Sequence, residues 1–175
     1  IWEKGTNRSA FFRGEVDKYG WVDIGSSFLP SELTAAFLYA QLENLDVIQT
    51  QRISIWNEYL EGFNEFLPNE LVKLPKIPGF AHNNAHMFYL VFDDLKIRQK
   101  FISYMKEQNI HTVFHYLSLN ESPYYLSKNL SDAKALVNAM KYEKGLVRFP
   151  FYFELTKEEI KFIIKCSKDF FNQII

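Results

Sequence analysis

The sequence predicts an α/β fold in which helices pack on a small sheet. Three short apolar runs, Met87–Phe92, Thr112–Leu117 and Leu146–Phe149, have the length and the aromatic and β-branched content of buried strands. Stretches with helical periodicity separate these runs along the chain. Strands that alternate with helices indicate a sheet covered by helices.

The first 29 residues predict an irregular arm. Glycines at positions 5, 14, 20 and 25 interrupt any regular period. The arm also carries large aromatic side chains that need a surface to cover them, either on this chain or on another domain: Phe11, Phe12, Tyr19 and Trp21. Polar residues in front of a helix suit anion binding, because free N–H groups and the helix dipole favour negative charge there. The alternative is a surface loop that caps the helix and binds nothing.

A long helix is predicted from Ser31 to about Phe66. Pro30 or Ser31 marks its start, and apolar residues recur on one side of it. Unbroken, it would be about 50 Å long. We therefore expect part of it to pack on another domain or a second subunit. A kinked helical hairpin near Asn44 to Asp46 is the alternative.

Local signals place the remaining elements. Leu71–Leu74 is a candidate edge strand, and Asp93 and Asp94 precede a helix over Leu95–Gln108. Residues 118–130 predict a loop, followed by a helix over about 133–142 that Ser131 and Asp132 would cap. Thr156 and Glu159 form a capping box at the start of the last helix.

Composition excludes some classes of function. Lys and Arg number 20 against 21 Asp and Glu, so the net charge of −1 provides no field for nucleic acid or an anionic membrane.

The single cysteine, Cys166, lies in an apolar periodic run, so we expect a buried structural thiol and a reducing, cytoplasmic setting. His82, His86 and His111 share no defensible metal-ligand spacing, so no metal is predicted. The chain opens without methionine, and we expect it to be a piece of a longer polypeptide.

Several blocks together resemble one enzyme family. They are Gly5–Ser9, Phe11–Gly14, Val16–Tyr19, Asp23–Ser27, Ala35–Ala36, Ala40–Leu42, Ala85–Tyr89, Val113–Tyr116 and Ser122–Pro123. In this order they resemble the DegT/StrS family of pyridoxal-phosphate sugar aminotransferases, and within it the branch that forms dTDP-4-amino-4,6-dideoxygalactose. The resemblance covers nearly the whole chain but only the second half of such an enzyme.

The resemblance implies a fold and an organisation. It implies an arm from the end of the large domain over residues 1–30, a long interdomain helix over 31–66, and the small C-terminal domain of a fold-type-I transferase over 67–175. It also implies a cytoplasmic homodimer with an active site shared between the subunits. Such an enzyme transfers an amine from glutamate to a dTDP-linked 4-keto-6-deoxyhexose for bacterial lipopolysaccharide or other surface polysaccharides.

The resemblance also implies roles for particular residues. Ser27 would reach the phosphate of pyridoxal 5′-phosphate in the neighbouring subunit, where the family often has asparagine. Substrate-binding residues would be Arg13, Lys18, Tyr19, His115 and Tyr116. The family places its Schiff-base lysine upstream of Ile1, so this chain alone should be inactive.

Three other interpretations stay open. His115 alone on a strand is often a structural residue, and the second histidine that the family has after its His-Tyr pair is absent here. A pyridoxal-phosphate sugar dehydratase of the same family lacks the Schiff-base lysine. This chain does not contain the Schiff-base position, whose residue decides between the aminotransferase and the dehydratase. A non-enzymatic α/β interaction module would use the aromatic arm and the long helix as a docking surface.

Overall fold

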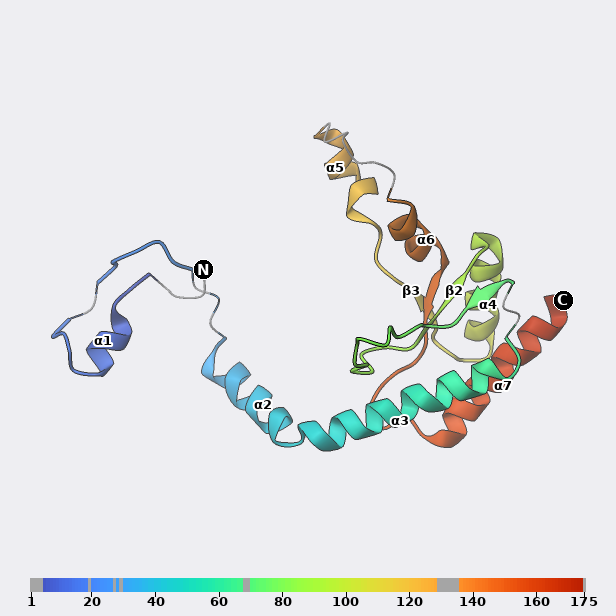
Figure 1. The fold of residues 1–175 in the computed structure, drawn as a ribbon, viewed down its shortest axis with the longest axis horizontal. Helices are drawn as coiled ribbons and strands as arrows, with labels where there is room; N and C mark the ends of the chain where they lie inside the picture. The colour runs from blue at the N-terminus through green and yellow to red at the C-terminus, as the bar shows by residue number, and fades with distance from the viewer. Residues whose placement is uncertain are drawn as a thin grey trace. The chain divides into compact units, whose positions relative to one another are not determined.

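The computed structural model describes residues 5–18, 20–26, 28, 30–67, 70–128 and 136–174. Their elements in chain order are α1 (Arg8–Phe12), α2 (Glu32–Glu43), α3 (Leu45–Asn64), β1 (Val72–Lys73), β2 (Tyr89–Phe92), α4 (Leu95–Glu107), β3 (Val113–Phe114), η1 (Leu119–Glu121), α5 (Pro123–Ser127), α6 (Val137–Gly145), β4 (Leu146–Arg148) and α7 (Lys157–Ile174) (Figure 1). The chain divides into two compact units, Ile1–Leu45 and Asp46–Ile175. The expected division at residues 30 and 66 stays a prediction.

The second unit contains a four-stranded sheet in the order β1-β2-β4-β3. Every neighbouring pair is antiparallel, so β2 and β3 run parallel with β4 inserted between them. The helix α4 connects these two parallel strands along the chain. The predicted α/β class is confirmed, and Leu71–Leu74 does contain the edge strand β1.

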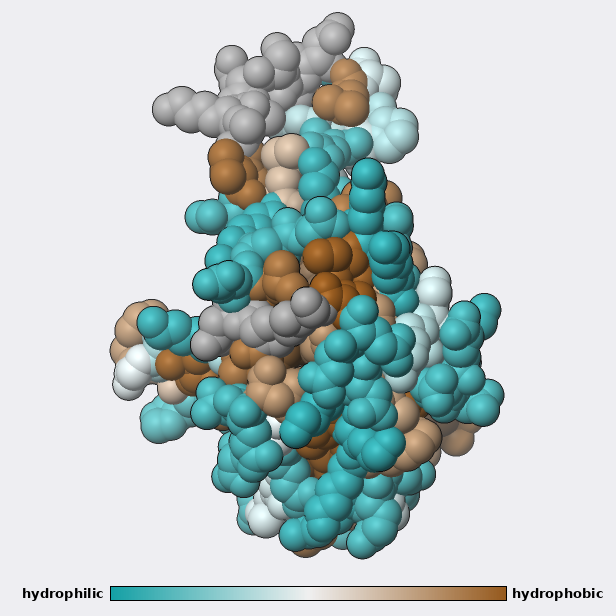
Figure 2. Space-filling model, turned by 90° about the vertical axis from the view of Figure 1, so that its right-hand side faces the viewer, coloured by the Kyte–Doolittle hydropathy of each residue, from teal (hydrophilic) through white to brown (hydrophobic). Residues whose placement is uncertain are grey.

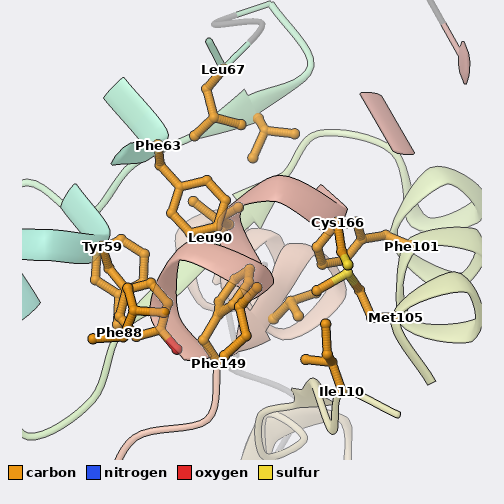
Figure 3. Packing of buried hydrophobic residues seen from close by; sticks show 14 of the residues in the cluster. Tyr59, Phe63, Leu67, Phe88, Leu90, Phe101, Met105, Ile110, Phe149 and Cys166 are labelled. Atoms are coloured by element: carbon orange, nitrogen blue, oxygen red, sulfur yellow. The ribbon is translucent and has the colours of Figure 1, made fainter. Parts of the chain in front are cut away.

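An aromatic cluster forms the core between α3, α4, α7 and one face of the sheet (Figure 3). The rings of Tyr59 and Phe88 stack with centroids 5.0 Å apart, and those of Phe63 and Phe149 meet edge to face, also at 5.0 Å. The buried Tyr59 hydroxyl donates a hydrogen bond to the Pro150 carbonyl at 3.0 Å. Aromatic pairs add to the stabilisation that burial alone gives. The core therefore fixes α3 and α7 against the sheet.

The predicted helix starts are confirmed by their hydrogen bonds. The Ser31 side chain accepts from Thr34 N at 3.2 Å, and Asp94 accepts from Ile97 N at 2.8 Å. At α7 the capping box is complete. The Glu159 carboxylate accepts from the Thr156 main chain at 2.8 Å, and the Thr156 hydroxyl accepts from Glu159 N at 3.2 Å. Each bond satisfies an N–H group that the first turn of a helix leaves without a partner.

The long helix predicted over residues 31–66 is interrupted at Asn44. The Asn44 side-chain amide donates to the Ala40 carbonyl at 3.0 Å, and its main-chain N–H bonds to Gln41. These bonds end α2, because they occupy carbonyls that a continuing helix would use. The interruption falls where the alternative interpretation placed it. The helix α2 buries none of its residues, and Leu33 is 86% exposed.

The arm is more ordered than predicted, because hydrogen bonds close it on itself. It contains α1, and a bridge pairs Thr6 with Trp21. The Asn7 side chain accepts from Gly20 N at 2.7 Å. Gly5 has φ +69°, and a Cβ there would lie 2.0 Å from the Asp23 carbonyl oxygen, so only glycine fits this closure.

The loop predicted over residues 118–130 contains two short helices. In the described part of this stretch, η1 precedes α5, whose N-cap is Ser122 with Pro123 at the first helical position. This is a local start signal that the prediction missed. The predicted caps Ser131 and Asp132 lie outside the described residues, and the helix that follows, α6, extends to Gly145.

Cys166 is free and buried, as predicted. Burial raises the pKa of its thiol, which makes the thiolate a minor species near neutral pH. The described lysines of α4 and α7 are exposed. Figure 2 shows the side on which these two helices lie, and most of that surface is hydrophilic.

Candidate functional site

A histidine and an arginine lie near each other on the face of the sheet that points away from the core cluster. We call this face the outer face. Val113 of β3 pairs with Arg148 of β4, so their side chains share a face. His115, two residues beyond Val113, points the same way. Tyr89 of β2 pairs with Arg148 from its other side. Arg148 therefore lies between two strands and diagonally across from His115.

Two nitrogen atoms of these side chains have no hydrogen-bond partner. His115 Nδ1 and Arg148 Nε are shielded from solvent and bond to no group of the described chain, including each other. Both residues as a whole are half-buried. A buried polar atom without a partner costs about 1–3 kcal/mol, so such atoms are uncommon without a reason. Two of them on one face indicate a polar partner from outside this part of the chain.

The charges around His115 are positive. Burial lowers the pKa of its imidazole, and the positive charges of Arg148 and His86 lower it further. Each of these causes disfavours the protonated ring. His115 is thus a neutral imidazole near pH 7, in a field that attracts negative charge.

The loop that carries His86 is held by α3. The side chains of Asn83 and Asn84 accept hydrogen bonds from the main-chain N–H groups of Ala85 and His86, respectively, at 2.9 and 3.1 Å. Ala85 has a positive φ of 49°, an uncommon conformation for alanine. Arg52 of α3 bonds to both main-chain carbonyls, of Ala85 at 3.1 Å and of His86 at 2.5 Å. These bonds fix the loop beside the outer face.

Tyr116 follows His115 but points into solvent. Its ring lies 4.8 Å from that of His115, centroid to centroid, and its side chain is 78% exposed. The next turn is tied to α6, because the Glu143 carboxylate accepts from Ser118 N at 2.8 Å. The structure thus places the predicted pair His115 and Tyr116 directly after β3, on a segment that is tied to α6 at Ser118.

The predicted residues of the arm belong to the first unit. Arg13 is exposed and pairs with Glu15, with an Nε to Oε1 distance of 2.6 Å and an Nη2 to Oε2 distance of 3.0 Å. The hydrogen bond to Glu15 raises the pKa of the guanidinium. Lys18 is exposed. Tyr19 and Ser27 lie outside the described residues, so their roles stay predictions.

Arg148 was not among the predicted site residues. Its signal in the sequence is a charge inside the apolar run Leu146–Phe149. Such a charge alternates with core residues and so marks the face of a strand that is not in the core. Its neighbour His115 is 33 residues away in sequence, and only the pairing of β3 with β4 brings them together.

The described lysines do not fit a covalent cofactor anchor. A lysine that forms a Schiff base needs a lowered pKa, which comes from burial or from a cationic neighbour. Every lysine in the described ranges is exposed. The pKa of Lys165 is raised, first by its hydrogen bond to Asp169. This part of the chain can therefore contribute to a cofactor site only without a covalent bond.

The described residues form neither a metal site nor a membrane-spanning helix. No three side chains among the histidines, cysteines, aspartates and glutamates there are arranged to hold a metal ion. None of the helices in those ranges is long and apolar enough to cross a membrane.

Comparison with known protein sequences identifies a family and relatives that this chain resembles. The model of the DegT/DnrJ/EryC1/StrS aminotransferase family matches residues 4–168. The spore coat polysaccharide biosynthesis protein SpsC of Bacillus subtilis is 27% identical over 150 residues, which are 79% of this chain and 36% of that protein. The dTDP-3-amino-3,6-dideoxy-alpha-D-galactopyranose transaminase of Aneurinibacillus thermoaerophilus is 33% identical over 103 residues, 59% of this chain and 26% of that protein. The chain thus spans less than half the length of either relative.

Solved structures share the fold. The putative sugar aminotransferase Spr1654 from Streptococcus pneumoniae, in its apo form, superposes with a TM-score of 0.78 at 17% identity, over 98% of this chain and 41% of that one. Its pyridoxal-phosphate form gives a TM-score of 0.75 at 18% identity, over 98% of this chain and 42% of that one. At these identities the likeness shows the fold alone.

Proposed function

Because the chain belongs to the DegT/DnrJ/EryC1/StrS aminotransferase family, we propose that it is part of an enzyme that transfers an amine to a nucleotide-linked sugar with pyridoxal 5′-phosphate as cofactor. The match of the family model to residues 4–168 carries this proposal. Bound pyridoxal phosphate would supply the group that takes up and releases the amine. The described lysines are exposed, so the covalent anchor of the cofactor would come from another part of the whole protein.

The proposed substrate is a dTDP-linked 4-keto-6-deoxyhexose, with glutamate as the amino donor. The blocks of the arm, which include Asp23–Ser27, support the 4-amino branch of the family. The relative from Aneurinibacillus thermoaerophilus is named for a 3-amino sugar, so an assay should offer 3-keto and 4-keto substrates side by side. The name of SpsC supports a place in the synthesis of surface polysaccharide.

The chain's own residues would bind and orient the substrates. Arg13 and Lys18 would face the diphosphate, once Arg13 exchanges Glu15 for a phosphate oxygen. His115 and Tyr116 would line the side of the sugar or donor. Ser27 would donate a hydrogen bond to the cofactor phosphate of the other subunit in a cytoplasmic homodimer.

The test is made on the whole protein that carries this chain. Titration with pyridoxal phosphate should produce the visible absorption of a protein-bound cofactor, and glutamate should then support amination of the keto sugar. Binding without amine transfer would favour the dehydratase, and the residue at the Schiff-base position decides that case. Neither binding nor transfer would favour the interaction module, for which the exposed α2 provides a surface.

Ser27 can be tested separately from the reaction. Substitution of Ser27 by alanine should weaken cofactor retention by about 1 kcal/mol, the contribution of one hydrogen bond. Ser26→Ala, one position earlier, is the matched control. Unchanged retention in Ser27→Ala would remove this residue from the cofactor site.

A further inference from the structure

We propose that Arg148 and His115 form a binding site for an oxyanion, a carboxylate or a phosphate group, on the outer face of the sheet. The register of β4 with β3 and β2 places Arg148 in the middle of this face. No residue of β4 was a predicted site residue. The identity of the molecule that brings the oxyanion rests on the proposed function; the site itself rests on the geometry.

The geometry presents two unpartnered nitrogens to one region. Arg148 Nε is a donor that cannot lose its proton, and it has no acceptor. His115 Nδ1 likewise has no partner, and it can donate in one tautomer of the neutral ring and in the charged ring. Diagonal neighbours across an antiparallel pair have Cα atoms about 7–8 Å apart, within the reach of long side chains. One group with two acceptor oxygens can therefore bind both.

The chemistry of the surroundings favours an anion over a neutral ligand. The permanent positive charge of Arg148 acts on His115 and lowers the pKa of its imidazole, and His86 lowers that pKa further. The nearby carboxylate of Glu143 is already bonded to Ser118 N. Arginine binds carboxylate and phosphate with paired donors, and such charge-assisted bonds are stronger than neutral ones.

Hydrogen bonds and burial hold the residues around Arg148 in place on the outer face. Arg52 holds the carbonyl of His86, so this third basic residue is kept at the border of the site. Tyr89 flanks Arg148 on β2 and is half-buried, and burial raises the pKa of its hydroxyl, which keeps it neutral. A cation with supported neighbours loses little further side-chain entropy when it binds a ligand.

The experiment follows the imidazole signals of His115 by NMR in the 175-residue chain. Inorganic phosphate and glutamate are titrated separately at constant ionic strength, with chloride as the control salt. We expect at least one of the two to shift the His115 signals in a saturable manner. Saturation by phosphate identifies a phosphate-type ligand, saturation by glutamate a carboxylate-type ligand, and either outcome supports the site. A response no larger than that to chloride overturns it.

Arg148→Gln provides the second readout. It should weaken the binding of the responding anion at least about ten-fold, the effect of one charge-assisted bond. It should also raise the pKa of His115, because a neighbouring positive charge is removed. Arg98→Gln is the matched control: this half-buried arginine of α4 bonds to the Glu143 carbonyl at 3.4 Å. Equal weakening in both variants, or none in Arg148→Gln, overturns the proposal.

The two tests fail independently. The titration contains neither sugar nor pyridoxal phosphate, so a negative result leaves the aminotransferase proposal untouched. Conversely, an inactive whole protein would not alter a saturable response of His115. Only the assignment of the anion to an amino donor or to a sugar nucleotide depends on both.

Discussion

Gly145 lies where α6 passes directly into β4, and its lack of a side chain permits the contact between β4 and β2. A Cβ at this position would lie 2.2 Å from the Phe92 carbonyl oxygen and 3.1 Å from Val91 Cγ1. An ordinary carbon to oxygen contact is about 3.3 Å, so β4 and β2 would have to separate by about 1 Å at this point. The contacted oxygen belongs to the main chain of a central strand, which pairs with β1 and β4.

Gly145→Ala should therefore destabilise the protein. Overpacking costs about 1–3 kcal/mol, and the upper half of that range applies because no side chain can rotate away. The better helix propensity of alanine offsets at most about 1 kcal/mol, and less at the last residue of a helix. The net loss is about 2 kcal/mol, which corresponds to about 4–8 °C in Tm for a chain of this length.

Urea unfolding monitored by circular dichroism and by the fluorescence of the buried Trp56 measures this loss. Gly79→Ala is the matched control, since a Cβ at Gly79 meets no atom within 4 Å. Its stability should stay within about 0.5 kcal/mol of the parent, or rise slightly through the unfolded state. If Gly145→Ala is as stable as Gly79→Ala, the close approach of β4 to the Phe92 carbonyl is wrong.

Three further changes test the caps, the core and the charges. Thr156→Ala removes the capping box of α7 and should cost about 1 kcal/mol in urea unfolding; no loss would mean that the cap does not stabilise the helix. Tyr59→Phe leaves a main-chain carbonyl of the core without its donor and should cost about 1–2 kcal/mol by the same measurement, whereas an unchanged midpoint would place that carbonyl in contact with water. The pKa of Asp93 is lowered, first by its hydrogen bond with Lys141 and also by Lys73. The ionised carboxylate therefore stabilises the folded protein above the ordinary carboxyl pKa, and this contribution is lost as the pH falls through the lowered pKa. Asp93→Asn should therefore flatten the acid side of a pH series of unfolding midpoints below about pH 4, and parallel curves would contradict this.

Features decided by a few neighbouring residues could be predicted from the sequence. The caps at Ser31, Asp94 and Thr156 each depend on one side chain and an N–H group three residues away. Gly145 and Pro150 bound the strand β4 in the same local way. The class of the fold follows from the alternation of such elements.

Features that depend on competition between neighbouring groups or on distant contacts were predicted incompletely, and the break at Asn44 was expected only as the alternative to a continuous helix. The side chain of Asn44 competes with the helix backbone and ends α2, although the apolar stripe continues past it. Leu95 is an apolar residue of α4, yet as the first residue of this helix it is 41% exposed. The periodicity of apolar residues predicts which side of a helix faces the core, but not how far along the helix the core extends.

The candidate site also combines a feature that local sequence predicts with one that depends on distant contacts. His115 could be named because the block Val113–Tyr116 resembles the family, but Arg148 could be linked to it only through the order β2-β4-β3. An order that separated β3 from β4 would place Arg148 beside a different strand and leave His115 without this cationic neighbour. In the observed order the odd positions of β3 and the even positions of β4 share one face, away from the core. A one-residue change of register would bury the guanidinium among the aromatic rings at a cost of several kcal/mol. The packing that stabilises the sheet therefore also determines that these two basic side chains meet.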